Sequence, residues 1–207
     1  MPSKSVLKRG FKTEAERISE KFRDELGHSP NDPLDAFELA SYLKVPVFTV
    51  ADIFGGEQAS EAASHLCNPD NFSAMWMLNN EGIQIIIHNS FHSRYRQQSN
   101  IMHELSHIIR KHEIPEKLAI LCSQFNLHYY NPLHEEEAKY LGGCLQITRE
   151  GLMWALRQGM THTEMSAHFS ASLEMVKYRL GITGAERQRS YQLNKRYYMS
   201  TTTKSSG

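Results

Sequence analysis

Two histidines four residues apart, with a glutamate beside the first, have the types and spacing that metal chemistry needs. They lie in the stretch His103-Glu104-Leu105-Ser106-His107. On an α-helix, residues i and i+4 share one face, so both imidazole rings could bind one metal ion. Glu104 would lie on the adjacent flank, where its carboxylate could hydrogen-bond a water molecule without binding the metal. Two ligands and one general base within a helical turn predict a hydrolytic zinc site.

This chemistry requires that the motif lie on a helix, and the surrounding sequence predicts one. Residues 93–111 contain neither glycine nor proline. Apolar residues recur in this range at helical spacing, at Ile101, Met102, Leu105, Ile108 and Ile109. We therefore expect a long amphipathic helix. The alternative is that His103 and His107 are ordinary polar residues on a solvated face of that helix.

A hydrolytic zinc site needs a third protein ligand, and an acidic run could supply it. The run is His134-Glu135-Glu136-Glu137, at the start of an expected helix over residues 133–147. An alternative explanation needs no metal, because carboxylates near a helix N-terminus stabilise the helix by interacting with its dipole. Helical spacing aligns Glu135 with Gly142, a small residue that would let a neighbouring helix approach closely, and it disfavours Glu136. From the residues alone, Glu135 and Glu137 remain competing candidates.

The rest of the chain predicts an α+β fold. Its 207 residues, 40% of them hydrophobic, can bury one core, or one core and a small appendage. Residues 72–78 and 83–88 predict a β-hairpin, and residues 45–50 predict a strand that lies at an edge or begins near Pro46. Further helices are expected at residues 13–27 with Thr13 as N-cap, 34–43, 114–125, 148–157, and as a pair within 161–180. We expect a small antiparallel sheet packed on the helix of the motif, followed by a helical C-terminal region.

Composition narrows the class of protein. The formal net charge is zero, so the chain as a whole is not a generic binder of polyanions. It has three cysteines and no C-x-x-C pair, which favours a reducing compartment over a disulfide framework. No apolar run is long enough to span a membrane, and the N-terminus lacks the apolar segment of a signal peptide. We expect a soluble cytoplasmic protein.

Two segments together carry a resemblance to a known family. H-E-L-S-H, followed by E-E-E-A-K-Y-L-G-G-C-L-Q-I-T at residues 135–148, resembles the ImmA/IrrE family of metallopeptidases. The resemblance extends loosely over residues 34–182. It implies a thermolysin-like, gluzincin-type zinc endopeptidase with His103, His107 and Glu135 as zinc ligands and Glu104 as the general base. Candidates for a donor to the oxyanion are His128, Tyr129 and Tyr130.

The resemblance also implies a substrate. At some positions, however, this sequence departs from the family's pattern. Members of the family commonly cleave a helix-turn-helix repressor encoded beside them, in mobile elements or in a stress response. The implied partner is therefore such a repressor, and the implied role is that of an anti-repressor. Lys139 stands where the family usually has Asn or Asp, a group that orients a ligand histidine. Compared with the family's motif, the residues around the ligands are thus altered, whereas the implied ligands themselves are all present.

The chain is expected to comprise four segments. Residues 1–10 are expected to be a flexible N-terminal tail, and residues 11–148 a zincin-like metallopeptidase domain. Residues 149–185 are expected to form a helical, helix-turn-helix-like C-terminal region. Residues 186–207 are expected to be a basic, largely disordered tail.

Two other functions remain as alternatives. One is a catalytically degenerate metal-binding protein that binds its partner without cutting it. The other is a DNA-binding regulator, because residues 163–169 and 172–180 could form a helix-turn-helix around Ser170-Ala171. The second helix offers only Lys177 and Arg179 as cations, few for neutralising phosphates. For this helical pair we favour packing or partner docking over direct nucleic-acid binding.

Overall fold

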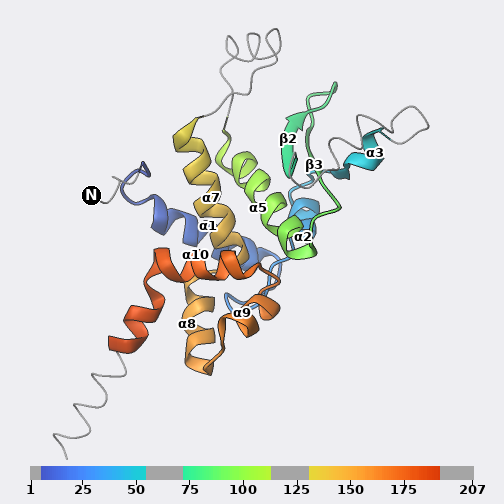
Figure 1. The fold of residues 1–207 in the computed structure, drawn as a ribbon. Helices are drawn as coiled ribbons and strands as arrows, with labels where there is room; N and C mark the ends of the chain where they lie inside the picture. Colours follow the sequence, from blue (N-terminus) through green and yellow to red (C-terminus); the bar gives the residue numbers. More distant parts are fainter. Residues whose placement is uncertain (1–5, 55–71, 113–130, 192–207) are drawn as a thin grey trace, which may run out of the picture.

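The structure, a computed structural model, describes residues 6–54, 72–112 and 131–191. Its helices are α1 (Phe11–Glu25), α2 (Ala36–Tyr42), α3 (Val50–Phe54), α5 (Arg94–Arg110), α7 (Pro132–Gln146), α8 (Arg149–Gln158), α9 (His162–His168) and α10 (Leu173–Thr183). Its strands are β1 (Val47–Thr49), β2 (Ala74–Leu78) and β3 (Gln84–His88). Figure 1 shows α5 and α7 side by side, with the sheet beyond α5 and helices α8 to α10 at one end of α7. The predicted α+β class is confirmed.

Helix α5, which carries the histidine motif, begins and ends within one residue of the predicted range. Its N-cap is Ser93, whose hydroxyl accepts a hydrogen bond from the backbone N–H of Arg96. Its C-cap is Lys111, which adopts the left-handed conformation at φ 54°. Ile101, Met102 and Leu105 are fully buried, so one face of α5 lies in the main core. The predicted amphipathic helix is confirmed.

Helix α7 approaches α5 closely because Gly142 has no side chain. A Cβ atom added at Gly142 would lie 3.2 Å from the backbone oxygen of Met102 and 3.3 Å from Cα of His103. The first turn of α7 is fixed by Asn131, whose side chain accepts hydrogen bonds from the backbone N–H groups of Leu133 and His134. The acidic run is thereby held beside the middle of α5.

We expect Gly142→Ala to destabilise the fold by about 1–3 kcal/mol, because only backbone atoms of α5 could yield to the new methyl group. The matched control is Gly181→Ala in α10, where nothing lies within 4 Å of an added Cβ. That control should stabilise by up to about 1 kcal/mol, since alanine favours a helix over glycine. Chemical denaturation measures both values. Equal effects in the two variants would contradict the close approach.

The sheet is small and mixed. Its order is β1-β3-β2, with β2 antiparallel to β3 and β1 parallel to β3. The predicted hairpin of β2 and β3 is confirmed, and β1 lies at an edge and begins directly after Pro46, as expected. The prediction of a small antiparallel sheet did not anticipate that β1 pairs in parallel with β3. A long crossover, rather than a tight turn, joins β1 to β3, and such a connection allows parallel pairing.

Some other expectations differ from the structure or lie outside it. Helix α1 begins at Phe11 and not after Thr13, because Phe11 is buried and packs edge-on against the ring of Tyr140. Residues 186–191, at the start of the predicted tail, are helical. The expected helix at 114–125, the candidate oxyanion donors at 128–130 and the remainder of the tail lie outside the described residues.

The C-terminal helices have a small core of their own, and one buried arginine from α10 and one from α1 bind the C-terminal end of α7. This second core includes Ile147, Leu152, Phe169, Val176 and Leu180. Arg179 of α10 donates to the backbone oxygen of Ile147, and Arg23 of α1 donates to those of Leu145 and Gln146. Both guanidinium groups therefore bind carbonyls at the C-terminal end of α7, where positive charge is favoured. Across the described ranges, no helix combines the length and apolar character that crossing a membrane requires.

Candidate metal centre

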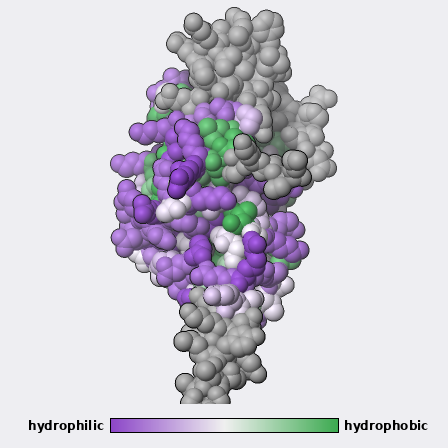
Figure 2. Space-filling view, turned by 90° about the vertical axis from the view of Figure 1, so that its left-hand side faces the viewer, coloured by the Kyte–Doolittle hydropathy of each residue, from purple (hydrophilic) through white to green (hydrophobic). Residues whose placement is uncertain are grey.

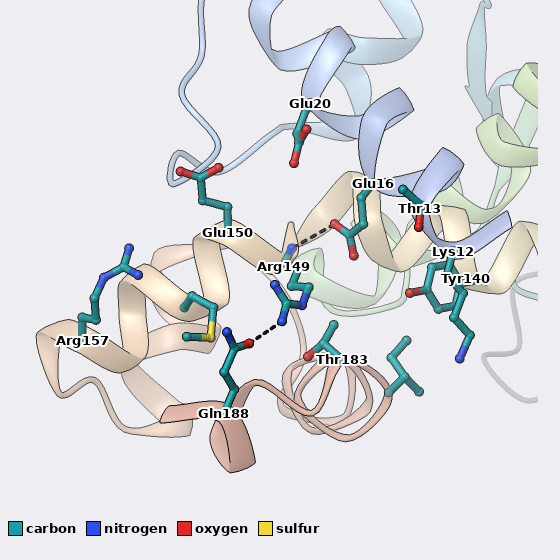
Figure 3. A pocket seen from close by; sticks show the side chains of 12 residues that line it. Lys12, Thr13, Glu16, Glu20, Tyr140, Arg149, Glu150, Arg157, Thr183 and Gln188 are labelled. Atoms are coloured by element: carbon teal, nitrogen blue, oxygen red, sulfur yellow. Dashed lines mark hydrogen bonds between the residues drawn. The ribbon is translucent and has the colours of Figure 1, made fainter. Parts of the chain in front are cut away.

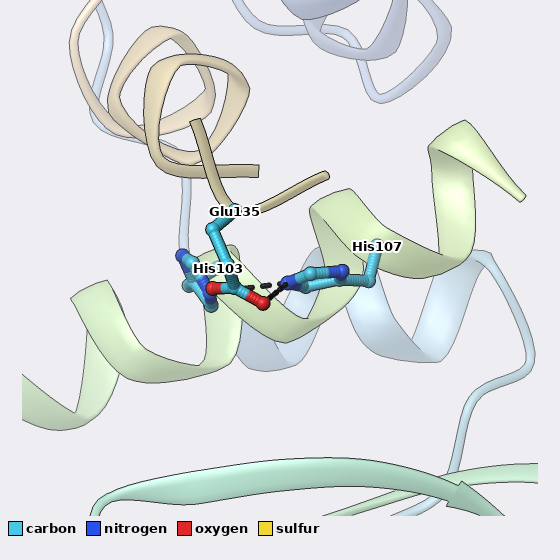
Figure 4. A group of neighbouring side chains, drawn as sticks. All are labelled: His103, His107 and Glu135. Carbon is cyan, nitrogen blue, oxygen red and sulfur yellow. Dashed lines mark hydrogen bonds and ion pairs between the residues drawn. The ribbon is translucent and has the colours of Figure 1, made fainter. Parts of the chain in front are cut away.

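Three side chains from two helices meet at one point between α5 and α7. His103 and His107 lie one turn apart on α5, and Glu135 lies in the first turn of α7 (Figure 4). The Nε2 atoms of the two rings are 3.1 Å apart. The carboxylate oxygens of Glu135 lie 3.2 Å from Nε2 of His103 and 3.7 Å from Nε2 of His107. In the described part of the chain, no other three His, Cys, Asp or Glu residues form such a group.

The spacing and chemistry of these donors fit a zinc ion. A tetrahedral zinc ion with nitrogen and oxygen ligands at about 2.0–2.2 Å separates neighbouring ligand atoms by about 3.3–3.5 Å. The three separations of 3.1, 3.2 and 3.7 Å bracket that range. His107 is buried, whereas His103 and Glu135 are partly exposed, so the centre opens to solvent on one side. A fourth, open position is what a catalytic zinc site requires.

Glu135, and not Glu137, lies with the histidines. The Glu137 carboxylate is buried on the far side of His107, where Arg110 and His112 donate to it. Because α7 presents the two residues two positions apart, their side chains leave the helix in different directions. The geometry therefore separates the two candidates that helical spacing leaves open.

The electrostatics of the group suit the replacement of a proton by a metal. Burial, together with the charge of His103, lowers the pKa of His107 to about 4, so this ring is neutral near pH 7. Burial also lowers the pKa of His103, but its hydrogen bond to Glu135 and the charge of Glu104 outweigh that effect and raise it overall. The same hydrogen bond lowers the pKa of Glu135. His103 and Glu135 thus form an ion pair whose proton a divalent cation can replace.

Glu104 is held beside this group by the sheet. The backbone N–H of Trp76, in β2, donates to Oε2 of Glu104 at 3.0 Å. The backbone of Ser73 accepts from Asn89 and that of Asn79 donates to Ile83, so alternate residues of β2 bond to β3 and the N–H of Trp76 points away from β3. Burial raises the pKa of Glu104, although the charge of His103 and the Trp76 bond oppose the rise. A carboxylate with a raised pKa is a stronger base than an ordinary glutamate.

A match to a family sequence model shows which protein family this chain belongs to. The sequence model of the M78 peptidases, described as the IrrE N-terminal-like domain, matches residues 60–181, more than half of the chain. The chain belongs to this family. The resemblance inferred from the two motifs is confirmed, and the match includes α5, α7, α8, α9 and all but the last two residues of α10. No curated protein matches the chain.

Membership in the M78 family supports a metallopeptidase-like role, and the structure adds a residue that the sequence did not point to. His112 contacts the buried side of His107 and in turn contacts Glu137, which the sequence offers only as a candidate third ligand. The signal that could have found His112 is its place directly after the end of the motif helix. Lys139 departs from the family pattern, and its Nζ lies 5.2 Å from the centre of the Tyr178 ring.

The two helices predicted within residues 161–180 are present as α9 and α10, but few residues of α10 are exposed. α9 and α10 are joined through Ser170, which has a positive φ of 49°. The exposed residues of α10 are Leu173, Glu174, Lys177 and Gly181. Arg179, the second expected cation, is buried and bound to Glu16. The exposed face of α10 thus carries one cation and one anion, a poor match for a phosphate backbone.

A cavity of about 730 Å³ lies between α1, α7, α8 and α10, away from the metal centre (Figure 3). Two hydrogen bonds join residues of its lining. Glu16 accepts from the backbone N–H of Arg149 at 2.9 Å, and the Arg149 guanidinium donates to Gln188. Figure 2 shows that the described surface on the α1 side is mostly hydrophilic. We assign no chemistry to this cavity.

Proposed function

We propose that this M78 family member is a zinc-dependent endopeptidase. The observation that carries the proposal is the convergence of two imidazoles and a carboxylate beside Glu104, which the sheet edge holds in place. His103, His107 and Glu135 would hold the zinc ion. Glu104 would act as the general base.

The residues around the centre suit peptide hydrolysis. A bound zinc ion would supply a Lewis acid that polarises the scissile carbonyl and acidifies water. Glu104 accepts a proton from the water molecule while the water oxygen forms a bond to the carbonyl carbon. Glu104 then gives that proton to the leaving amine as the C–N bond breaks. The N–H of Trp76 keeps the Glu104 carboxylate in position for both transfers. We propose that an extended substrate segment pairs with the edge of β2 that lies away from β3.

As the substrate we propose a helix-turn-helix transcriptional repressor encoded beside the gene, so that cleavage would have an anti-repressor effect. This step rests on the resemblance to the ImmA/IrrE family. We further propose a cytoplasmic site of action, because a reducing compartment suits the free thiol of Cys144.

A second candidate function is a protein that binds metal and partner without cutting. The position of Lys139 favours it, since this side chain lies over Tyr178 and does not orient a ligand histidine. Incubation with the neighbouring repressor separates the two functions. A stable complex without fragments would support the binder, and fragments would support the peptidase.

The metal content of the protein tests the proposal. We expect about one zinc ion per chain in protein purified without a metal-chelating tag, as for a site with three protein ligands. His103→Ala should lose the zinc, because two ligands remain. Elemental analysis against protein concentration measures both. A wild-type protein without zinc, even after supplementation, would refute the proposed metal site.

A further inference from the structure

We infer that His112 and Glu137 are positioning residues that fix the tautomer of His107 so that its Nε2 lone pair faces the metal centre. The inference rests on the proposed function, in which His107 is a ligand. It concerns a buried row of side chains behind that ligand. Nδ1 of His112 lies 3.0 Å from Nδ1 of His107, and Nε2 of His112 lies 3.2 Å from Oε2 of Glu137. The exposed fractions of His107, His112 and Glu137 are 7%, 7% and 5%.

The direction of these hydrogen bonds follows from the carboxylate at the buried end. An ionised carboxylate can only accept, and Arg110 already donates to Oε2 of Glu137 from Nε at 3.0 Å. Nε2 of His112 must therefore carry its hydrogen. A neutral imidazole has one N–H, so Nδ1 of His112 is an acceptor, and Nδ1 of His107 must donate to it.

The consequence lies at the other nitrogen of His107. With its hydrogen on Nδ1, this ring has a lone pair on Nε2, the atom that faces His103 and Glu135. A lone pair on that atom is what a metal ligand needs. The row thus sets the correct tautomer before any metal binds.

The local backbone holds the His112 ring against His107. Lys111, in the left-handed conformation, turns the chain back at the end of α5, and the backbone N–H of His112 donates to the backbone oxygen of His107. The ring of His134 stacks on that of His112, with centroids 4.2 Å apart and planes 2° from parallel. Any residue at position 112 could make the backbone bond. The ring nitrogens are therefore what an experiment has to change.

Three substitutions at one position separate positioning from packing. His112→Asn places an amide oxygen near the position of Nδ1 and so keeps an acceptor for His107. His112→Gln places its amide near Nε2, in reach of Glu137 but not of His107. His112→Phe keeps a ring that can stack on His134 and removes both hydrogen bonds.

The first measurement is the zinc dissociation constant, by competition with a chelator of known affinity. We expect the Gln and Phe variants to bind zinc about 10–100-fold more weakly than the wild type, the usual cost of losing such a partner. The Asn variant should stay within about threefold, because its oxygen can replace Nδ1 as the acceptor. The Asn and Gln variants carry the same amide, so the comparison holds even where Phe disturbs the fold. Equal affinities of these two variants would overturn the inference.

The second measurement is the tautomer of His107 in the metal-free protein, from long-range proton–nitrogen NMR correlations. Wild type and His112→Asn should show the hydrogen on Nδ1, and His112→Gln a mixture of tautomers. A mixture in the wild type would overturn the inference and leave the zinc site standing. A wild type that binds no zinc would overturn the proposed function instead, and the tautomer would still decide whether His112 fixes His107.

Discussion

Replacing Glu104 with glutamine is expected to lower the rate of peptide hydrolysis by about 10²–10⁴-fold while zinc remains bound. The amide has nearly the shape of the carboxylate and can still accept from Trp76 N–H, but it cannot take a proton from water. His103 and its two partner ligands are untouched, so zinc affinity should change little. The measurement is the rate of fragment formation from the neighbouring repressor at saturating zinc, with zinc content determined on the same samples.

Two controls show whether such a loss is chemical. Glu136→Gln makes the same change on the exposed face of α7 and should leave the rate unchanged. Burial raises the pKa of Glu104, so at neutral pH the ionised group favours the unfolded chain, and its neutral replacement should stabilise the metal-free fold. We expect a gain of about 0.5–2 kcal/mol, the usual range for a stabilising substitution. Full hydrolytic activity in Glu104→Gln would refute the assignment of Glu104 as the base.

Local pattern was enough to predict most elements of this fold, though not the short helix α3, because each signal acts within a few residues. The end of the motif helix at Lys111 and the N-cap at Thr148 match the structure, as do both strands of the hairpin. The start of α1 could not be found in this way. Phe11 is part of α1 because its ring packs against that of Tyr140, which lies more than a hundred residues away in the sequence. Such a contact leaves no trace in the capping pattern.

The site shows the same division between local and tertiary information. Spacing alone places His103 and His107 on one face of α5. The choice between Glu135 and Glu137 depends on how α7 crosses α5, which Gly142 fixes by allowing contact with the backbone of His103. Helical periodicity does not show which residues of two helices lie against each other. It therefore leaves both glutamates as candidates for the third ligand, and only the family resemblance favours Glu135.

His112 escaped prediction for a different reason. It lies five residues after His107, a spacing that does not share a helical face. The chain turns back there because Lys111 adopts a positive φ, a conformation that residues with a side chain seldom take. No pattern in the sequence marks a lysine for that role. The partners of a predicted ligand can therefore lie just beyond the element that carries it.

Replacing Arg179 with methionine should destabilise the protein by about 3–5 kcal/mol, the usual cost of breaking a buried ion pair. The Arg179 side chain is fully buried and donates to Oε1 of Glu16 at 2.6 Å and to the backbone oxygen of Ile147 at 2.8 Å. Methionine fills a similar volume but leaves the nearly buried Glu16 carboxylate without its cation. The free energy of unfolding from chemical denaturation measures the loss, and adding Glu16→Gln should recover part of it.

The stability of Arg179→Met also tests whether α10 binds DNA or supports the fold. Arg187→Met removes an exposed cation from the same region and should change stability by no more than about 0.5 kcal/mol. A similarly small effect of Arg179→Met would mean that this arginine is free to bind a phosphate, and the DNA-binding alternative would regain its support. A large effect would place the arginine in the fold. Because Arg179 binds the end of α7 opposite to Glu135, α10 would then support the helix that carries the third proposed zinc ligand.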